Sequence, residues 1–215
     1  MTRHLARTLG ALAFLPALAA ARPTHSSSAA GAPPRAGALD TAVFAGGCFW
    51  GVEGVFEHVR GVRSATAGYA GGTLAAPSYE QVSTGETGHA ESVRVVYDPS
   101  RVSYAQLLQV FFTVAHDPTE LNRQGPDVGT QYRSAVFYRT PAQKAAVDAY
   151  LARLRTSHAF AKPIVTQVAP LGRFNEAEAY HQGYMAKHPD APYIVYNDAP
   201  KVADLKKRFA GLYQG

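Results

Sequence analysis

The sequence predicts an α+β domain, a two-layer sandwich in which helices pack against a mixed β-sheet. Two observations support this class. The chain is 47% hydrophobic and 17% charged, the balance of a globular protein that buries a sizeable core. Strand-like and helix-like segments follow one another along residues 40–215, but without the strict alternation that a parallel α/β sheet requires.

The residues before position 40 differ in composition from the rest of the chain. A positively charged start precedes an apolar run that ends in an A-x-A pattern at Ala21, which predicts a cleavable signal peptide over 1–21. Residues 22–39 are rich in Ser, Ala, Pro and Gly and predict a flexible linker. We therefore expect a periplasmic or secreted protein with one domain over 40–215 and no stable membrane insertion after cleavage.

The first predicted unit of the domain is a strand followed at once by a helix. Residues 41–47 are mostly apolar and end in two glycines, which stop a strand. One apolar helical face then follows from the spacing of Val52, Val55, Phe56 and Val59. Cys48 is therefore expected at the junction, close to the N-terminus of the helix.

The remaining elements follow from the same patterns. Strands are predicted at 62–72, 91–98, 132–139 and 162–170. Helices are predicted at 103–115, 141–157, 175–189 and 199–214. Ser103 is a candidate N-cap for the first of these helices, and Pro141 occupies the favoured first turn of the second.

Composition excludes several classes of partner. The net charge of +5 is spread along the chain without a basic stripe interleaved with aromatic residues, so a nucleic acid is not an expected partner. One cysteine and eight dispersed histidines give no spacing typical of a zinc site, so no metal site is predicted. We expect a monomer.

The single cysteine, Cys48, cannot form an internal disulfide and is therefore either an inert buried residue or a reactive thiol. A helix N-terminus carries a partial positive charge, which favours a thiolate and is expected to lower the pKa of Cys48. Gly47 leaves room for a group to approach the sulfur. Phe49 and Trp50, which follow directly, are expected to form an apolar wall.

Two further segments carry candidate polar groups. In "YEQVSTGETGHAE", residues 79–91, Glu91 precedes a strand, and a partly desolvated carboxyl group there would donate a proton near neutral pH. The alternative is a solvated Glu in a glycine-rich loop. In the long polar segment 117–134, Tyr132 is expected to point a phenol into a cleft and Asp127 to orient it. The alternative is a plain connection.

Three motifs together resemble the A-type peptide methionine sulfoxide reductases. They are "GCFWG" (47–51), "YEQVSTGETGHAE" (79–91) and "NRQGPDVGTQYRS" (122–134), and the resemblance runs from about Thr41 to about Asp198. It implies a variant of the ferredoxin-like α/β plait. It also implies reduction of the S-epimer of methionine sulfoxide, free or in proteins, without a bound cofactor.

The resemblance also implies roles for individual residues. Cys48 is similar to the family's nucleophile, and Glu91 to the acid that protonates the sulfoxide oxygen. The other implied site residues are Tyr79 and Tyr132, which hydrogen-bond that oxygen, Asp127, which helps to set the site, Phe49 and Trp50, which hold the substrate methyl group, and Gly47 and His89, which we add as substrate-binding residues.

The sequence departs from the family pattern in its lack of a resolving cysteine. Many relatives carry further cysteines, but here the C-terminal tail has none and Ser83 stands where relatives often have one. We therefore expect that an external thiol, a thioredoxin-like or glutaredoxin-like protein or a small thiol, regenerates Cys48. Two rival interpretations stay open: a cysteine hydrolase with His89 or His181 as its base, and an exported binding module without enzymatic activity.

Overall fold

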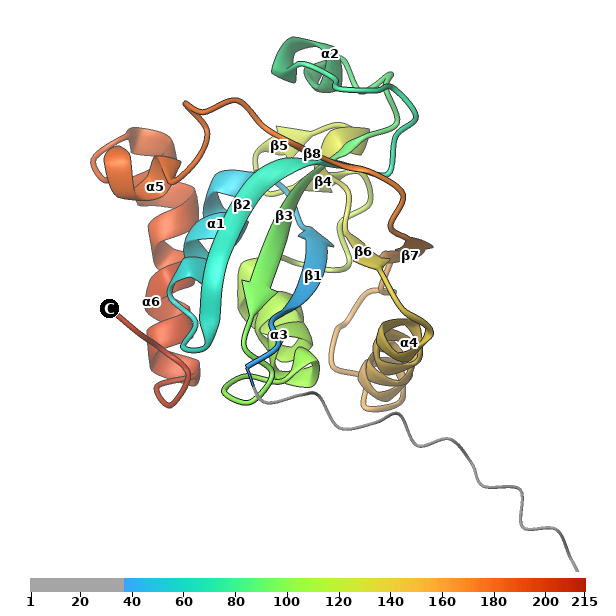
Figure 1. The fold of residues 1–215 in the computed structure, drawn as a ribbon, viewed down its shortest axis with the longest axis vertical. Coiled ribbons are helices and arrows are strands. Elements are labelled where there is room, and N and C mark those ends of the chain that lie inside the picture. The colour runs from blue at the N-terminus through green and yellow to red at the C-terminus, as the bar shows by residue number, and fades with distance from the viewer. Residues whose placement is uncertain (1–36) are drawn as a thin grey trace, which may run out of the picture. The chain divides into compact units, whose positions relative to one another are not determined.

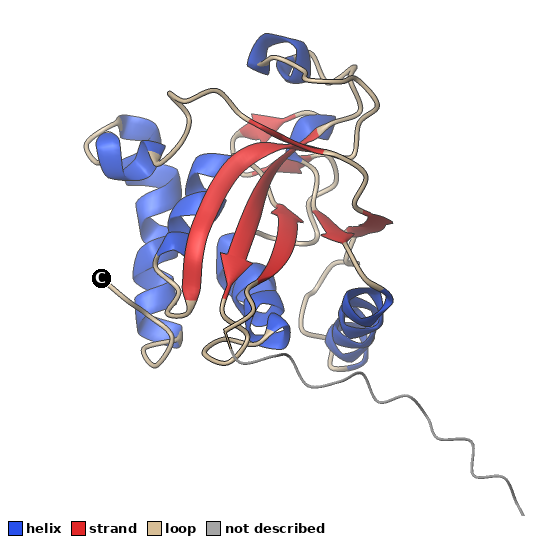
Figure 2. Cartoon of the chain, in the orientation of Figure 1, coloured by secondary structure: helices blue, strands red, loops and turns tan. Residues whose placement is uncertain are grey.

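The computed structural model describes residues 37–215, so the predicted signal peptide and most of the predicted linker lie outside the described residues. A six-stranded sheet in the order β7-β6-β1-β3-β2-β8 forms the centre (Figures 1 and 2). Its strands are β1 (Asp40–Ala45), β2 (Val62–Ala70), β3 (Ala90–Tyr97), β6 (Ala135–Tyr138), β7 (Gln167–Pro170) and β8 (Phe174–Glu176). The separate hairpin comprises β4 (Arg123–Gln124) and β5 (Asp127–Val128).

The sheet is mixed, as predicted. β1 pairs antiparallel with β3 and β6, and β2 pairs antiparallel with β3 and β8. Only β6 and β7 run parallel, and helix α4 (Pro141–Thr156) supplies the crossover that a parallel pair needs. The register pairs Tyr69 of β2 with Glu91 of β3, which places Glu91 near one end of the sheet. The predicted α+β class is therefore confirmed.

Helices α1, α3 and α6 lie along one face of the sheet in Figure 1. The helices are α1 (Phe49–Glu57), α2 (Tyr79–Ser83), α3 (Tyr104–Val110), α4, α5 (Tyr184–Lys187) and α6 (Ala199–Arg208). Two π-helical turns, Phe111–Ala115 and Ile194–Asp198, adjoin α3 and α6. Within residues 37–215, no helix combines the length and the apolar character needed to cross a bilayer.

The helix starts follow from local sequence. Ser78 and Ser103 cap α2 and α3, and in each case a Gln side chain three residues later bonds back to the serine's backbone N–H to complete a capping box. Thr140 caps α4, and Pro141 occupies its first turn as predicted. The capping box of α2 fixes where Tyr79 begins its helix.

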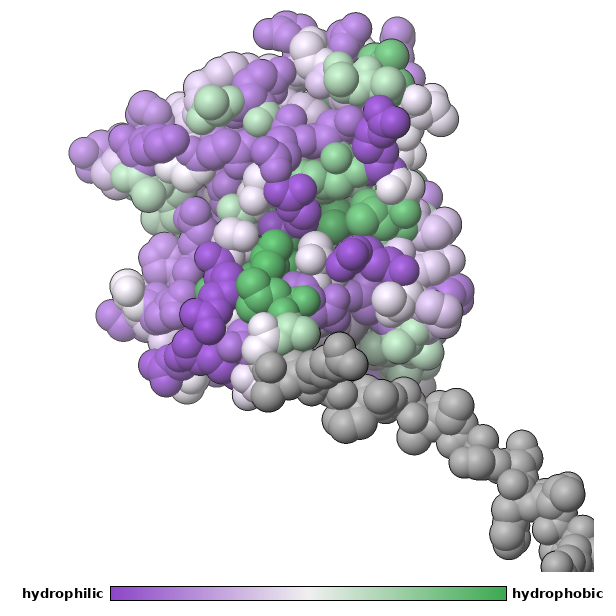
Figure 3. Space-filling view, in the orientation of Figure 1, coloured by the Kyte–Doolittle hydropathy of each residue, from purple (hydrophilic) through white to green (hydrophobic). Residues whose placement is uncertain are grey.

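The main core lies between the sheet and the helices. It stacks Phe44 of β1 between Phe56 of α1 and Phe111, with ring centroids 5.2 and 4.8 Å apart. A smaller apolar cluster covers the opposite face of the sheet, where Val43 and Phe137 are fully buried. Figure 3 shows apolar residues gathered over the sheet on the face toward the viewer, with hydrophilic residues around them. Both faces of the central strands are therefore shielded from water.

The prediction of a helix over 175–189 is wrong. Residues 174–176 form strand β8, and only Tyr184–Lys187 is helical. Gly183 has a φ of +60°, which is outside the right-handed helical region. The side chain of Gln182 also bonds to both the N–H and the C=O of Ala67 in β2, at 3.0 and 2.9 Å. Tertiary hydrogen bonds thus override the helical pattern of this segment.

The strand predicted over 162–170 is also shorter in the structure. Only Gln167–Pro170 pairs with β6. The preceding residues bond elsewhere, since the Val165 N–H donates to the carbonyl of Pro118 at 2.9 Å. This segment therefore joins the sheet only where β6 offers a parallel edge.

Two glycines of α1 give a prediction about stability. A methyl group at Gly51 would lie 2.0 Å from Oδ1 of Asp198, which is fully buried and bonded to Lys201. Overpacking of this kind costs about 1–3 kcal/mol and should exceed the gain of about 1 kcal/mol in helix propensity. We expect Gly51→Ala to lower the free energy of unfolding in urea.

Gly54→Ala is the matched control in the same helix. There the methyl group would meet only the Met185 side chain, whose far end lies at 2.7 Å, and this flexible chain can move aside. We expect Gly54→Ala to be neutral or stabilising by up to about 1 kcal/mol. Equal losses in both variants would contradict the close packing of Asp198 against α1.

Candidate active site

A cavity of about 200 Å³ opens where the N-terminus of α1 meets the start of β3. Seven of the nine residues predicted for the site line it, although they come from three distant parts of the sequence. The lining residues are Cys48, Phe49, Trp50, Tyr79, Glu91, Asp127, Tyr132 and Tyr193. We name this cavity the sulfur cavity.

Cys48 is the N-cap residue of α1, as the sequence predicts, but its electrostatic state differs from the expectation. Its side chain is 8% exposed and faces the cavity. Burial raises the pKa of the thiol well above its ordinary value, and the charges of Glu91, Asp198 and Asp127 add to this. The backbone N–H of Trp50 lowers the pKa, but burial outweighs it. The resting thiol is therefore protonated, and the prediction that the helix N-terminus lowers the pKa of Cys48 is wrong.

Glu91 lies in β3 and is buried beside Cys48. Its Oε2 accepts a hydrogen bond from the backbone N–H of Phe49 at 3.0 Å, which ties the strand to the first turn of α1. Burial raises the pKa of Glu91 to about 8, and the charges of Asp127 and Asp198 contribute. The carboxyl group is therefore neutral at pH 7, and Oε1 is left to carry its proton.

The two tyrosines of the predicted site reach the cavity from separate elements. Tyr79 begins α2, and Tyr132 ends a 3₁₀ turn over Thr130–Tyr132. Burial raises the pKa of both phenols, and the charge of Glu91 adds to this effect. Both groups therefore carry their protons throughout the neutral range and are hydrogen-bond donors.

Asp127 enters the cavity from the hairpin of β4 and β5. Its Oδ2 accepts a hydrogen bond from the hydroxyl of Tyr193. Tyr193 stands directly before the π-helical turn Ile194–Asp198, a type of irregular turn that is frequent at functional sites. Asp127 is thus oriented by Tyr193 rather than orienting Tyr132 through a direct hydrogen bond.

An aromatic wall forms the apolar side of the cavity. The indole N–H of Trp50 donates to Nδ1 of His181 at 3.1 Å, and the indole stacks on Tyr184 with centroids 3.7 Å apart. The His181 ring also packs against Phe49 and Tyr79, at 4.9 and 4.5 Å. Because Nδ1 accepts this bond, the imidazole carries its proton on Nε2 when neutral. These contacts hold the rings of Phe49 and Trp50 in fixed orientations.

Gly47 and His89, the other two predicted residues, lie outside the lining of the cavity. Gly47 has a φ of +90°, and a Cβ there would lie 2.5 Å from Gln124, so this glycine allows the hairpin to close over the turn. His89 is buried and its ring packs closely against Gly72: a Cβ atom added to Gly72 would lie 2.2 Å from Nδ1 of His89. Neither side-chain position contributes a group that faces Cys48.

Sequence reasoning missed the contribution of the segment 177–198. It considered His181 only as a hydrolase base and predicted no site role for Tyr184 or Tyr193. The signal available was the density of aromatic and histidine residues in a segment that also contains glycine. The lining of the sulfur cavity includes no histidine, so it offers Cys48 no base of the kind that a cysteine hydrolase needs.

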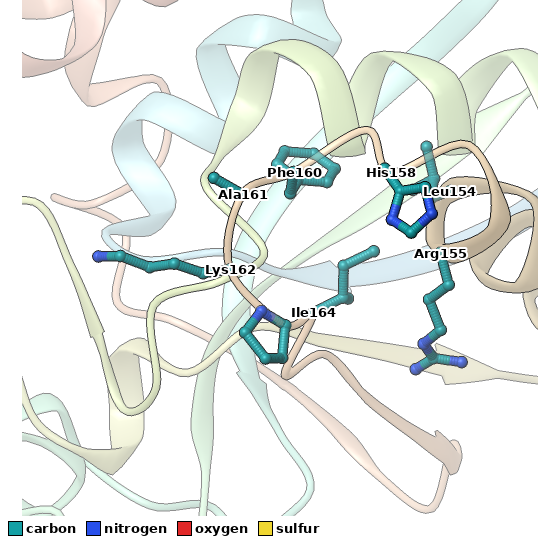
Figure 4. Close-up of a pocket in the computed structure, with 8 residues that line it drawn as sticks. Leu154, Arg155, His158, Phe160, Ala161, Lys162 and Ile164 are labelled. Atoms are coloured by element: carbon teal, nitrogen blue, oxygen red, sulfur yellow. The ribbon is translucent and has the colours of Figure 1, made fainter.

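Another cavity, of about 250 Å³, lies at the C-terminal end of α4 and shares no residue with the sulfur cavity. Figure 4 shows its basic side chains, and Arg155 and Lys162 extend toward different sides. The positive charges do not converge on one point, as the binding of an anion would require. This cavity is therefore a gap in packing beside the loop 158–164.

The protonated thiol gives a prediction about reactivity. Because the thiolate is the reactive form, Cys48 should react slowly with iodoacetamide at pH 7, and the rate should still rise above pH 9. A free thiol with a pKa of about 8.5 is the control and should level off earlier. A plateau for Cys48 below pH 8 would show instead that the helix N-terminus outweighs burial.

Glu178 gives a prediction about positioning. Its Oε1 accepts the backbone N–H of Tyr79 and its Oε2 accepts the hydroxyl of Tyr69, both at 2.8 Å. Removing the carboxylate frees the start of α2, and a displaced catalytic group costs up to about a hundredfold in rate. We expect Glu178→Ala to slow the reaction at Cys48 about tenfold or more. Glu176→Ala, an exposed neighbour, is the control and should stay within about twofold.

Comparison with known proteins agrees with this geometry. Residues 40–212 match the family model described as peptide methionine sulfoxide reductase. The chain is 55% identical over 174 residues to "Peptide methionine sulfoxide reductase MsrA 2" of Mesorhizobium japonicum, covering 81% of this chain and 89% of that protein. It is 50% identical over 171 residues to the protein of the same name from Synechocystis, covering 80% of each.

Solved structures give the same result. The reduced form of Mxr1 from Saccharomyces cerevisiae is similar with a TM-score of 0.65 and 32% identity, over 71% of this chain and 87% of that one. Methionine sulfoxide reductase A of Corynebacterium diphtheriae is similar with a TM-score of 0.63 and 38% identity, over 71% and 76%. The fold and the site define a thiol-dependent oxidoreductase, and the chain belongs to the peptide methionine sulfoxide reductase family. Its activity is that of a peptide-methionine (S)-S-oxide reductase of the A type.

Proposed function

We propose that Cys48 reduces methionine-S-sulfoxide, in oxidised proteins and as the free amino acid, through a sulfenic acid intermediate. The juxtaposition of Cys48 with Glu91, Tyr79 and Tyr132 in one small cavity carries this proposal. A sulfoxide sulfur is a poor electrophile until its oxygen accepts protons or strong hydrogen bonds. The carboxyl group of Glu91 and the hydroxyl groups of Tyr79 and Tyr132 supply these protons and hydrogen bonds at the sulfoxide oxygen, where negative charge develops during the reaction.

The substrate methyl group would rest against Phe49 and Trp50, with the sulfoxide oxygen toward Glu91. Because the sulfur of a sulfoxide is chiral, fixing both its methyl group and its oxygen lets only one epimer present the sulfur to Cys48. Each epimer therefore requires its own enzyme. The fixed aromatic wall supports this selection, since the contacts of Trp50 with His181 and Tyr184 hold the ring in place.

The protons in the site allow a balanced reaction. Cys48 attacks the substrate sulfur as its thiol proton and that of Glu91 pass to the oxygen, which leaves as water. The remaining sulfur–sulfur bond is broken by water, which returns a proton to Glu91, releases methionine and leaves the sulfenic acid Cys48–SOH. One thiol and one sulfoxide thus give one sulfenic acid and one thioether. The high pKa of the resting thiol means that Cys48 loses its proton only during this step.

An external thiol must then reduce Cys48–SOH, because no second cysteine exists in the sequence. A thioredoxin-like protein, a glutaredoxin-like protein and a small thiol are the chemical classes that can do so. No cofactor is required by these steps.

The test uses the two resolved sulfoxide epimers in a peptide. With one equivalent of the S-epimer, mass spectrometry should show methionine formed and one oxygen gained at Cys48, and Cys48→Ser should show neither. Equal rates for both epimers, or methionine formation without a change at Cys48, would refute the proposal.

Two finer assignments belong with this proposal. We infer that the fold is a variant of the α/β plait, and the order β6-β1-β3-β2 of the four central strands supports this. We also propose export, which the charged and apolar start of the sequence and its A-x-A pattern at Ala21 support. N-terminal sequencing of the protein from separated cell fractions tests it, and an intact Met1 in the cytoplasmic fraction alone would refute it.

A further inference from the structure

A second cavity is lined by the same cysteine, Cys48. It has a volume of about 70 Å³ and is lined by Cys48, Gln124, Gly125, Pro126, Asp127, Tyr193, Asn197 and Lys201. Cys48, Asp127 and Tyr193 line both cavities, and the hydrogen bond between Asp127 and Tyr193 joins the residues of this shared wall. We name the smaller one the lysine cavity. The space around Cys48 therefore has two compartments.

The two compartments differ in chemistry. Besides the shared residues, the sulfur cavity is lined by aromatic rings, a carboxyl group and phenol hydroxyl groups. The lysine cavity is lined instead by side-chain amide groups and an ammonium group. The Lys201 ammonium donates one of its three N–H bonds to Asp198 at 3.0 Å. Asn197 donates one amide N–H to the carbonyl of Tyr193 at 3.1 Å. Each side chain thus retains N–H groups that can serve a ligand.

The position of Gln124 adds to this picture. Its amide accepts from the N–H of Asp117 at 2.9 Å and donates to the carbonyl of Asp117 at 3.0 Å. The side chain is therefore fixed as a wall and does not swing into the cavity. Gly125 and Pro126, at the tip of the hairpin, are exposed and form the outer lip.

The chemistry of regeneration needs such a second approach. A thiol that reduces a sulfenic acid displaces oxygen from sulfur, and it attacks along the extension of the S–O bond. Once methionine has left, rotation about the Cβ–Sγ bond lets the hydroxyl group of Cys48–SOH take the place of the sulfoxide oxygen, where Tyr79 and Tyr132 can donate hydrogen bonds to it. The attacking thiol must therefore reach Cys48 from a different side, and the lysine cavity meets Cys48 beyond the wall of Asp127 and Tyr193.

We propose that the lysine cavity is the entry site for the reducing thiol, and that its ligand is a small cysteinyl thiol. This inference rests on the proposed function. A volume of about 70 Å³ has room for a CH₂–SH group but not for a protein element. The N–H donors of Lys201 and Asn197 match carboxylate or amide oxygens beside the thiol-bearing carbon.

The reaction balances with two molecules of this thiol. The first thiol attacks Cys48–SOH, forms the mixed disulfide with Cys48 and releases water. The second thiol attacks the mixed disulfide, restores the Cys48 thiol and leaves a disulfide between the two small molecules. Two thiols are oxidised for each sulfoxide reduced.

The experiment separates the two halves of the cycle. The full chain is first oxidised with one equivalent of S-sulfoxide peptide, and Cys48–SOH is confirmed by trapping with dimedone. The sulfenic acid is then mixed with cysteine or with cysteamine, which lacks the carboxylate. We expect cysteine to react at least fivefold faster, after correction for the intrinsic reactivity of each thiol.

Variants locate the effect in the lysine cavity. Lys201→Met should abolish the preference for cysteine, and Lys201→Arg should restore it in part. Asn197→Phe fills the cavity and should slow both thiols at least tenfold relative to the sulfoxide step of the same variant. Lys207→Met, an exposed lysine on the same helix, is the control and should keep the preference.

Lys201→Met leaves the buried Asp198 carboxylate without its cation, so this variant is paired with Asp198→Asn/Lys201→Met, which removes both charges. Loss of the preference in the double variant supports the proposal equally well.

Equal reaction of cysteine and cysteamine with the unsubstituted protein, together with unchanged rates in Asn197→Phe, would overturn the inference. So would a thioredoxin-like protein that reduces Cys48–SOH equally fast in the unsubstituted protein and in Asn197→Phe, and faster than cysteine does. Failure to form Cys48–SOH at all would instead refute the proposed function, so the two failures are distinguishable.

Discussion

Glu91→Gln is expected to lower the single-turnover rate of methionine-S-sulfoxide reduction by about 10²–10⁴-fold, the usual contribution of a general acid. The amide keeps the shape of the carboxyl group and can still accept the backbone N–H of Phe49, but it has no acidic proton to give. Glu86→Gln, an exposed residue of the same motif, is the control. A loss of less than tenfold would exclude Glu91 as the proton donor.

The pH profile adds a second readout. Since burial raises the pKa of Glu91 to about 8, the rate of the sulfoxide step should fall about tenfold per pH unit above that value. Glu91→Gln removes the titrating group, so this decline should disappear in the variant. A decline that persists in Glu91→Gln would assign it to another residue.

The same substitution should increase stability. A carboxyl group with a pKa raised on folding stabilises the folded state fully below its unfolded pKa, near 4.5, and this contribution is lost as pH rises through about 8. Glu91→Gln should therefore raise the free energy of unfolding at pH 8, on the order of a few kcal/mol. Gain of stability with loss of activity would show that Glu91 is retained for its chemistry.

Tyr132→Phe is expected to lower the rate of the same step about 100-fold, and Tyr79→Phe to have a similar effect. Each substitution removes one hydrogen-bond donor from the sulfoxide oxygen while leaving the ring in place, and loss of one such donor typically costs about 10²–10³-fold. Tyr138→Phe, outside the cavity, is the control.

Binding of the product distinguishes this role from a purely structural one. A methionine peptide lacks the oxygen, so its affinity should be unchanged within about twofold in both tyrosine variants. A parallel loss of product affinity would show that the substitutions deform the aromatic wall rather than remove a donor.

The sequence was sufficient to predict the parts of the fold that depend on local pattern. The strand at 41–47, the helix that follows it, the helix capped by Ser103 and the helix that begins at Pro141 were predicted to within a few residues from spacing and helix-start signals. The prediction of a helix over 175–189 failed because polar groups of this segment form hydrogen bonds with β2 rather than with one another. Such tertiary hydrogen bonds leave no periodic signal.

In the site, too, local sequence motifs could be predicted whereas tertiary contacts could not. Cys48, Glu91 and Tyr132 lie in motifs, and their meeting in one cavity agrees with the resemblance. The orientation of the wall depends on His181, Tyr184 and other residues far along the chain, which no local pattern connects to Trp50. The prediction for the pKa of Cys48 was wrong because a helix N-terminus is visible in the sequence, whereas burial and three neighbouring carboxylates are not.

The buried, protonated thiol has a consequence for survival of the enzyme among oxidants. Hydrogen peroxide attacks thiolates far faster than thiols, and successive attacks lead to sulfinic and sulfonic acids that ordinary thiols cannot reverse. Because burial keeps the resting Cys48 in its thiol form, we expect hydrogen peroxide to oxidise it slowly.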